Sequence, residues 1–436
     1  MTGTTQDDYT DRYARRVRGM STSEIRALFA VASRPEVVSL AGGSPYIAAL
    51  PLDAVGEMLN RLATDQGATS LQYGIGQGTV ELRERICDVM TLSGITNASP
   101  DDVVVTVGGQ QALDLLARLF LDPGDVVLAE GPTYVGALGV FQAAQAQVQH
   151  VAMDDEGLIP AALEEAIAAT VRAGRRAKFL YTIPTFQNPA GVTLSEDRRE
   201  QVLDICERAG LLVIEDDPYG MLSFEGDAPL PLRARRRDGV FYVSTFSKTF
   251  APGLRVGWIL APHAVREKLV MMSEANVLCP SAFAQGAVTQ YLTTMPWREQ
   301  IKVYREIYRE RRDALLSALD DLMPDGTTWT HPTGGLFVWV TLPEGLDSKA
   351  MMPRAIAARV AYVPGTGFYG DGTGRGNMRL NFSFSAPERL REGVRRLSGV
   401  MEQELAMRAV FGGGAALGHH RRRGAAAADA PGPDLA

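Results

Sequence analysis

Seven short apolar runs recur between about residue 100 and residue 260, and they constrain the fold more than any other feature. They are DDVVVTV, DVVLAE, QVQHVAM, AKFLYTIP, LLVIEDD, VFYVSTF and VGWILAP. Helical patterns such as QQALDLLARLF and SEDRREQVLDICERAG lie between some of them. Strands that are apolar throughout and alternate with helices are typical of a mainly parallel sheet covered on both faces. The sequence therefore predicts an α/β fold, in which ligands bind at the carboxyl ends of the strands.

Composition narrows the class of protein further. The 436 residues are 46% hydrophobic, which is enough for two domains or one large domain with an appendage. A formal net charge of -7 gives no basic surface for nucleic acid, and no stretch is long and apolar enough to span a membrane. The polar N-terminal segment has no apolar core of a secretion signal, so we expect a cytoplasmic protein. The three cysteines show no CxxC spacing and the five histidines form no ligand cluster, so we expect no metal site.

The chain divides by pattern into five segments. A long amphipathic helix expected from Trp297 to Met323 connects the strand-rich region to a shorter α+β region. The expected segments are a flexible N-terminus (1–18), an arm with part of the small domain (19–50), a large domain (51–300), a small domain (301–411) and a disordered tail (412–436).

Lys248 lies where the chain leaves one predicted strand, in STFSKTFAPGLRVGW. A lysine there is usually a solvated surface residue. However, hydroxyl groups surround it, and Arg255 adds a second cation before the next apolar run. A lysine that is desolvated or close to another cation has a lowered pKa and becomes a usable amine nucleophile or base. We therefore predict an aldehyde cofactor that carries a phosphate.

Two other strand ends contain residues suited to such a cofactor. In VTVGGQQALDLL, Gly108 and Gly109 let the backbone turn into a helix whose free N–H groups, with Gln110, suit a phosphate. In EGPTYVGAL, Tyr134 is placed to stack on a flat ring. A tight turn and ordinary core packing are the respective alternatives.

Two further strand ends supply an amide and carboxylates. In QNPAG, the Asn188 amide is suited to donate to a phenolate oxygen, although Asn-Pro also occurs in plain turns. In IEDDPYG, Asp216 and Asp217 end an apolar run, and Tyr219 follows. A buried carboxylate needs a cation, and a protonated pyridine nitrogen is one. The alternative for either aspartate is a helix N-cap.

The order of these motifs along the chain resembles that of class I/II aminotransferases, which are fold-type I enzymes dependent on pyridoxal 5'-phosphate. The resemblance extends over about residues 20 to 405 and is strongest to the branch with 2-aminoadipate and kynurenine aminotransferases. It implies a large domain with a mainly parallel sheet between helices, and a small α+β domain. It also implies transfer of an amino group from an amino acid to a 2-oxo acid, with 2-oxoglutarate as acceptor and ping-pong kinetics.

The resemblance assigns cofactor roles to residues of this chain. Lys248 matches the lysine that carries the cofactor and moves the substrate proton. Asp216 matches the carboxylate on the pyridine nitrogen, and Asn188 and Tyr219 match donors to the phenolic oxygen. Tyr134 matches the stacking aromatic residue. The residues matched to the phosphate are Gly108, Gly109, Gln110, Ser247 and Arg255, with Thr245 in place of a hydroxyl that the family has at position 109.

Substrate and partner roles follow from the same resemblance. Arg379, in NMRLNFS, matches the arginine that binds the substrate α-carboxylate as a bidentate fork, close to Asn188. The glycines of AGGSP, Gly42 and Gly43, match a wall of the substrate site. Tyr73 matches a tyrosine that reaches the phosphate of the neighbouring subunit, which implies a homodimer.

Substrate preference rests on Arg26, in SEIRAL. It aligns with an arginine that contacts the substrate side chain in the aminoadipate branch, and the alternative is a solvated helix arginine. The first reading favours dicarboxylic or large aromatic substrates. The segment GGSPYIAALP differs from the family pattern and leaves side-chain specificity open.

Two other functions are compatible with the motifs. A β-lyase, decarboxylase or cyclopropane-carboxylate synthase needs the same lysine and ring contacts. A regulator that senses the cofactor carries a basic DNA-binding domain ahead of this region, and we expect none here because too few residues precede the arm. A degenerate homologue is disfavoured because the lysine, the aspartate and both arginines are present.

Overall fold

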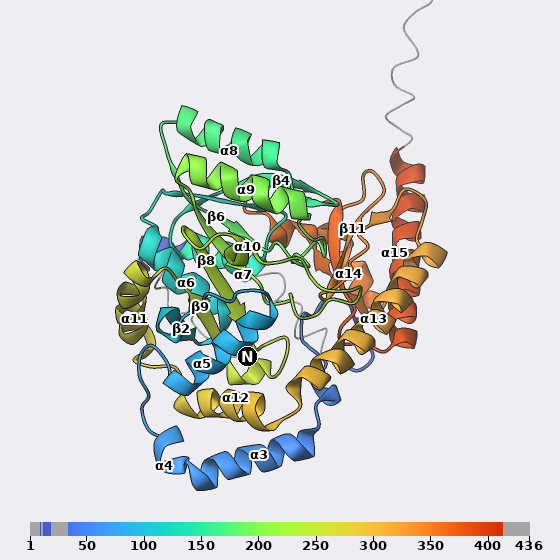
Figure 1. The fold of residues 1–436 in the computed structure, drawn as a ribbon. Coiled ribbons are helices and arrows are strands. Elements are labelled where there is room, and N and C mark those ends of the chain that lie inside the picture. The colour runs from blue at the N-terminus through green and yellow to red at the C-terminus, as the bar shows by residue number, and fades with distance from the viewer. Residues whose placement is uncertain (1–8, 10–11, 19–33, 413–436) are drawn as a thin grey trace, which may run out of the picture.

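An eight-stranded sheet forms the centre of the larger part of the protein (Figure 1). The computed structural model describes residue 9, residues 12–18 and residues 34–412. The strand order is β2-β9-β8-β7-β6-β3-β4-β5. The strands are β2 (Val103–Thr106), β3 (Val126–Gly131), β4 (Gln147–Asp154), β5 (Gly157–Leu158), β6 (Ala177–Thr182), β7 (Leu212–Asp216), β8 (Val240–Thr245) and β9 (Gly257–Leu260). Neighbours from β4 to β8 pair in parallel, whereas β9 and β5 are antiparallel to their neighbours. The predicted mainly parallel sheet is confirmed.

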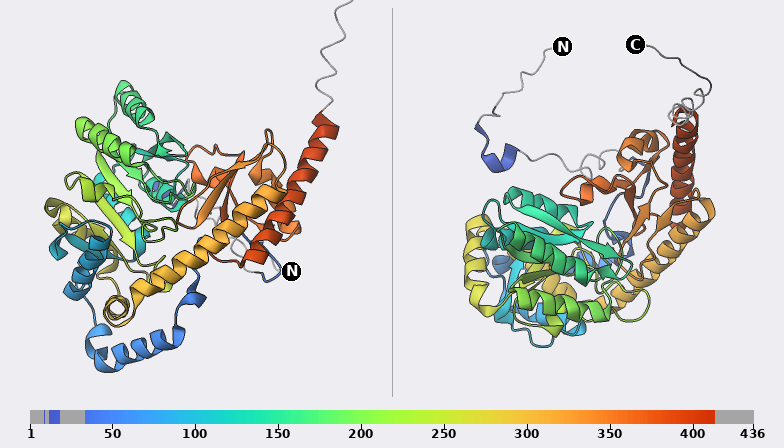
Figure 2. Two further views of the ribbon diagram at one scale, coloured as in Figure 1. Left: turned by 45° about the vertical axis from the view of Figure 1, so that its right-hand side comes forward. Right: turned by 90° about the horizontal axis from the view of Figure 1, so that it is seen from above.

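A second, four-stranded antiparallel sheet lies beside the first and has the order β10-β11-β14-β13. Its strands are β10 (Thr328–Trp329), β11 (Phe337–Thr341), β13 (Val363–Pro364) and β14 (Asn377–Asn381). Close by, β1 (Val38–Ser39) pairs in parallel with β12 (Val360–Ala361). The helices of this part are α13 (Trp297–Leu322), α14 (Ser348–Ala357) and α15 (Pro387–Gly412), and Figure 2 shows α13 and α15 side by side. The chain passes from the large sheet to the small one along α13, as the long amphipathic pattern predicted.

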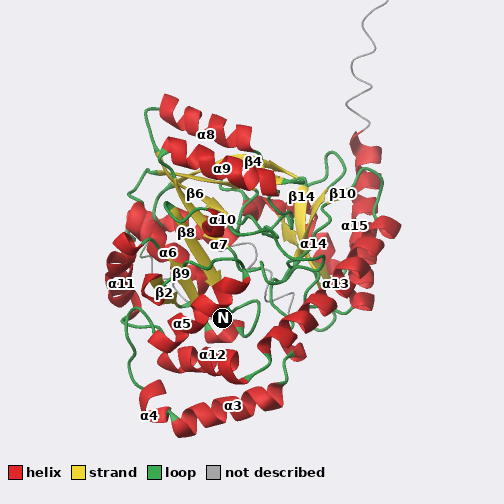
Figure 3. Ribbon diagram, viewed as in Figure 1, coloured by secondary structure: helices red, strands yellow, loops and turns green. Residues whose placement is uncertain are grey.

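Alternation along the strands separates the apolar side chains of the large sheet into two cores. Val126 and Leu128 of β3 pack with one set of helices, whereas Val127 and Ala129 pack with the other. Figure 3 shows helices on both sides of the strands. One face is covered by α8 (Pro160–Arg172), α9 (Glu196–Ala209) and α10 (Leu232–Arg235), and the other by α6 (Gly108–Phe120) and α7 (Val135–Ala143). Each residue on a strand is therefore assigned to one face by its parity.

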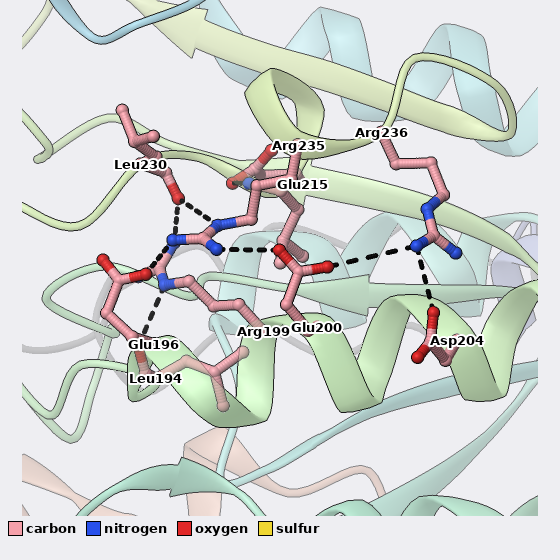
Figure 4. Close-up of polar contacts among 10 residues, drawn as sticks. Leu194, Glu196, Arg199, Glu200, Asp204, Glu215, Leu230, Arg235 and Arg236 are labelled. Carbon is pink, nitrogen blue, oxygen red and sulfur yellow. Dashed lines mark hydrogen bonds and ion pairs between the residues drawn. The ribbon is translucent and has the colours of Figure 1, made fainter.

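Ion pairs connect α9 to α10 on the outer side of the first of these faces (Figure 4). Arg235 pairs with Glu196 and Glu200, and Arg236 pairs with Asp204. Beneath them the fully buried Arg199 donates to backbone carbonyls, among them those of Leu194 and Leu230. Exposed pairs contribute little stability, so the buried hydrogen bonds are the stronger link.

The remaining helices lie around the large sheet and at the N-terminus. They are α1 (Arg15–Arg18), α3 (Leu52–Asp65), α4 (Gly67–Ser70), α5 (Val80–Leu92), α11 (His263–Val277) and α12 (Ala282–Thr294). Among the described residues, none of the helices is long and apolar enough to cross a membrane. Arg26 and the tail beyond residue 412 lie outside the described residues.

Candidate active site

Lys248 lies just beyond the carboxyl end of β8, and its Nζ donates to the carbonyl oxygen of Gly43 at 2.7 Å. Burial, reinforced by the Arg379 and Arg255 guanidinium groups, lowers the pKa of the Lys248 amine to about 8. Both effects disfavour a charged amine. The uncharged amine, which is the form that acts as nucleophile and base, is therefore more accessible near neutral pH than in an ordinary lysine.

Lys248 lines a cavity of about 740 Å³ between the carboxyl ends of the strands and the four-stranded sheet. The predicted residues that line it are Gly43, Gly109, Gln110, Tyr134, Asn188, Asp216, Tyr219, Thr245, Ser247, Lys248, Arg255 and Arg379. The fold thus brings together side chains from seven separate stretches of the sequence.

Of the four remaining predicted residues, three are described by the structure and do not line this cavity. Gly42 lies at its edge, where its carbonyl oxygen is 3.4 Å from Arg379 Nη2. Gly108 lies beneath the Arg255 guanidinium. The Tyr73 side chain is 78% exposed on the surface of this chain. The fourth, Arg26, is outside the described residues.

The first turn of α6 and the Arg255 guanidinium form a cradle suited to a phosphate. Gly108 begins the helix with a φ of 74°, and a Cβ there would lie 2.3 Å from Arg255 Nη2. Only glycine therefore lets the guanidinium lie against the helix start. Arg255 also donates to Ser247 Oγ at 3.2 Å. Free helix N–H groups, a guanidinium and a hydroxyl are the donors that phosphate binds best.

The Gln110 side chain also forms contacts with α7 and with Tyr134. Its Nε2 donates to the carbonyl oxygen of Gly136 at 2.9 Å, and its Oε1 lies 3.4 Å from Tyr134 Oη. The side chain therefore connects α6 to α7 and helps to place the Tyr134 ring at the cavity wall.

Asp216 is the last residue of β7, and its carboxylate accepts a hydrogen bond from Tyr181 Oη at 2.8 Å. Burial raises the pKa of Asp216 to about 7, although the Tyr181 bond opposes that shift. A buried carboxylate of this kind gains most from contact with a cation. The protonated nitrogen of a pyridine ring fits this position chemically.

The contacts of Asp217 show whether it is the helix N-cap that the sequence left open as an alternative. Its carboxylate accepts from the Gly220 N–H at 2.8 Å and from Tyr242 Oη at 2.9 Å. It holds the turn that follows β7 and caps no helix. Of the two aspartates, only Asp216 lines the cavity.

Asn188 and Tyr219 lie together at the cavity wall, with Asn188 Nδ2 3.4 Å from Tyr219 Oη. Burial raises the pKa of Tyr219, so the phenol keeps its proton and acts as a donor. Both groups can therefore donate to one oxygen atom on a bound ring.

Arg379 extends from β14 into the opposite wall of the cavity. Its Nη1 donates to Asn188 Oδ1 at 2.9 Å, its Nη2 donates to the Ala41 carbonyl at 2.9 Å, and the group lies 4.1 Å over the Phe337 ring. Its Nε is buried and has no hydrogen-bond partner. Burial lowers the pKa of Arg379 to about 10, which leaves it cationic at neutral pH. A buried cation with an unsatisfied donor suits a carboxylate ligand.

Sequence reasoning missed two residues of this site: Tyr181, which donates to Asp216, and Phe337, which lines the cavity. Tyr181 ends an apolar run, and its hydroxyl group is a signal that could have been read from the sequence. Phe337 comes from a strand far along the chain, and no local pattern connects it to Lys248. Within the described part of the chain, no group of three or more histidine, cysteine, aspartate or glutamate residues could hold a metal ion.

Comparison with known proteins now identifies this arrangement. The family model "Aminotransferase class I and II" matches residues 35–397. The chain belongs to the class I and II aminotransferases. It is 40% identical to aromatic-amino-acid aminotransferase 1 of Thermococcus litoralis, over 91% of this chain and 96% of that protein. It is 35% identical to 2-aminoadipate transaminase of Thermus thermophilus, over 89% and 96% respectively.

The solved structure of kynurenine aminotransferase from Pyrococcus horikoshii is similar to this protein throughout. It superposes with a TM-score of 0.87 at 38% identity, covering 92% of this chain and 99% of that one. The resemblance read from the motifs is confirmed: this is a fold-type I aminotransferase that depends on pyridoxal 5'-phosphate.

Proposed function

We propose that this aminotransferase works by ping-pong exchange, with 2-oxoglutarate as the amino acceptor, and that Lys248, Asp216 and Arg379 perform the central steps. The observation that supports this most directly is their convergence. An amine with a lowered pKa, a buried carboxylate and a buried guanidinium line one cavity although they come from different strands.

The residue roles follow from donor chemistry. Bound pyridoxal phosphate supplies an electron sink for the negative charge that develops at the substrate Cα. The Arg379 guanidinium binds the substrate α-carboxylate and so presents the Cα–H bond to Lys248 Nζ. The uncharged Lys248 amine would act as the general base that takes this proton and as the acid that gives it back. The Asp216 carboxylate would balance the positive charge of a protonated ring nitrogen, and Asn188 and Tyr219 would donate hydrogen bonds to the oxygen atom of the ring.

The phosphate anchor keeps the reacting atoms in place. The N–H groups at the start of α6, the Ser247 hydroxyl and the Arg255 guanidinium converge on one side of the cavity. Gly109 and Thr245 also line this region. Such fixed donors orient the ring relative to Lys248 Nζ, and this orientation contributes to the rate.

We propose large aromatic or dicarboxylic amino acids as donors. Apolar side chains line the same cavity, among them Leu113, Val140 and Phe337. The names of the relatives support the same classes, because they include aromatic-amino-acid, kynurenine and 2-aminoadipate aminotransferases. A role for Arg26 in reading the side chain remains a prediction, as does the cytoplasmic location.

The proposed assembly is a homodimer in which Tyr73 reaches the phosphate of the neighbouring subunit. Tyr73 is flanked by Leu71 and Ile75, and these side chains are 72% and 58% exposed. The loop is held locally, because the Gly74 N–H donates to Cys279 Sγ at 3.3 Å. A loop that exposes three large apolar side chains at alternate positions is typical of a protein–protein contact.

The absorbance spectrum of the purified holoenzyme tests the proposal. The cofactor band should bleach when a donor amino acid is added alone and return when 2-oxoglutarate follows. Bleaching that 2-oxoglutarate does not reverse, or release of a product other than the 2-oxo acid, would indicate a lyase or a decarboxylase. A protein without a bound chromophore would contradict the assignment of Lys248.

A further inference from the structure

We propose that Glu130 is a positioning residue for the substrate carboxylate, acting through Gln187 and Asn188 on Arg379. The inference rests on the proposed role of Arg379. Glu130 lies in β3 and does not line the cavity. It touches neither the cofactor nor the substrate site, and its influence passes through the turn that bears Asn188.

Glu130 lies on the face of the sheet opposite to Asp216. Val126 and Leu128 share its parity along β3 and pack in the core beneath α8 and α9. Thr182 and Glu215 occupy the matching positions of β6 and β7, where they pair across the strands. The Glu130 side chain is 1% exposed. A fully buried carboxylate needs strong local partners to offset its desolvation.

All the hydrogen bonds of the Glu130 carboxylate come from the last residue of β6 and the segment that follows it. It accepts from Thr182 Oγ1 at 2.5 Å, from the Ile183 N–H at 3.1 Å and from Gln187 Nε2 at 3.1 Å. Burial raises its pKa, and these three donors together with the Arg199 charge oppose the shift. The carboxylate thus collects three donors from residues 182–187 at a single point.

Gln187 passes this constraint to the turn. Its Nε2 donates to Glu130 and also to the Pro132 carbonyl at 2.8 Å, while its Oε1 accepts from the Ala190 N–H at 2.7 Å. The reversed amide orientation would set two donors against each other at Ala190 and two acceptors against each other at Glu130. Only one orientation therefore satisfies every partner, and it holds both ends of the Asn188 turn.

Asn188 then places Arg379. Asn188 Oδ1 accepts from Arg379 Nη1 at 2.9 Å, and the remaining described bonds of that guanidinium go to the carbonyls of Ala41 and Gly42. Arg379 thus has one side-chain acceptor, and its orientation depends on where the Asn188 turn lies. The chain of contacts runs from the far face of the sheet to the substrate wall.

Glu215 provides a matched control. It is 0% exposed, lies across the sheet from Thr182 and accepts two backbone hydrogen bonds, from the Leu232 and Arg233 N–H groups at 2.8 Å each. These two bonds go to the start of α10 and not to the segment 182–190 that Glu130 holds; Figure 4 shows Glu215 beside α9 and α10. Removing either carboxylate leaves buried donors unpaired, so both substitutions should lower stability.

The experiment compares Glu130→Met, Glu130→Gln and Glu215→Met as holoenzymes. Single-turnover absorbance titration with a donor amino acid separates the dissociation constant from the limiting rate. Glu130→Met should raise the dissociation constant about ten-fold, the change that one hydrogen bond of about 1.4 kcal/mol represents. The cofactor band and the limiting rate should stay near those of the wild type. Glu130→Gln keeps an acceptor for Ile183 and Gln187 and should bind nearly normally, and Glu215→Met should bind normally while melting at a lower temperature.

If Glu130→Met does not fold, Gln187→Leu tests the same chain of contacts, because it removes the side chain that connects Glu130 to the Asn188 turn. It should raise the dissociation constant similarly, and in a double variant the two changes should not add, because they break the same link. An equal rise in Glu215→Met, or unchanged binding in both Glu130→Met and Gln187→Leu, would overturn the inference. Arg379→Lys distinguishes the two levels of the argument: if it leaves binding unchanged, the proposed role of Arg379 fails as well; if it weakens binding while the other variants do not, only the inference about Glu130 fails.

Discussion

The two walls of the active-site cavity are built in different ways. One wall consists of strand ends of a single sheet, with Asp216 at the end of β7 and Lys248 just beyond the neighbouring β8. The other joins Gly43, Phe337 and Arg379, which come from an N-terminal segment and two strands of the smaller sheet. A rigid sheet thus supplies the first wall, and a junction between distant segments supplies the second.

The walls also differ in electrostatics. Burial moves the pKa of Asp216 up to about 7 and that of Lys248 down to about 8, so both groups can change charge near neutral pH. Arg379 is equally enclosed, but its pKa of about 10 keeps it charged. The first wall is therefore suited to proton transfer and the second to binding an anion. Changes in the first should affect rate, and changes in the second should affect binding.

Lys248→Ala should have the largest effect. Without the amine, no group at this position can take the substrate proton, so the single-turnover rate should fall by more than about a thousand-fold. Stopped-flow absorbance with a saturating donor amino acid measures it. Lys268→Ala, on the exposed side of α11, is the control and should change nothing. A Lys248→Ala enzyme within ten-fold of the wild-type rate would remove the distinction between the walls.

Asp216→Asn should follow, with a rate reduction of about a hundred-fold. The amide cannot balance a positive ring nitrogen, although it retains a partner in Tyr181 Oη. The limiting rate should fall while the dissociation constant of the donor changes little. Asp238→Asn on the surface serves as the control. A weakened affinity with an unchanged rate would place Asp216 with the binding wall instead.

Arg379→Lys should show the opposite pattern. A lysine cannot form the bidentate fork, so kcat/KM for the donor should fall by about thirty-fold to a hundred-fold, mainly through weaker binding. The spectrum of the bound cofactor should remain that of the wild type. Loss of the cofactor band would show that both walls are needed for cofactor binding, so that the second wall does not serve the substrate alone.

Arg255→Gln should produce the smallest change, a shift in the pH dependence of Lys248. Arg255 is one of the cations that lower the Lys248 pKa, so its removal favours the charged amine and moves that pKa upward from about 8. Modification of Lys248 in the cofactor-free enzyme by a small amine-reactive reagent, measured by mass spectrometry across pH, gives the midpoint. At pH 8 the variant should react more slowly, by less than about ten-fold, which corresponds to a shift of less than about one pKa unit. A midpoint that moves downward would contradict the electrostatic cause.

Much of the first wall was accessible from the sequence. A charged residue that ends an apolar run, such as Asp216, or follows one, such as Lys248, is costly to bury without a purpose, and parallel strands bring such ends to one edge. The same reasoning applies to Glu130 at the end of VVLAE, yet its parity directs it to the other face. The local pattern predicts that a charged residue at such a strand end has a function or a buried partner. It does not show on which face of the sheet the side chain lies.

The second wall depended on tertiary structure. Arg379 was recognised only through a family motif, and nothing near it in sequence indicates that its guanidinium meets Asn188 and Ala41. The large exposure of Tyr73, the turn held by Asp217 and the bridge from Gln110 to Gly136 were likewise visible only in the folded chain.

The sequence by itself determined the class of fold, the edge of the sheet where chemistry occurs and the kind of cofactor, because apolar periodicity and strand-end polarity are local properties of the chain. Tertiary structure decided which buried acid faces the cavity, what fixes Arg379 and how the distant segment with Gly43 meets Lys248. Those features depend on hydrogen bonds between residues far apart in sequence, whose directions are set only when the strands, turns and helices have packed together.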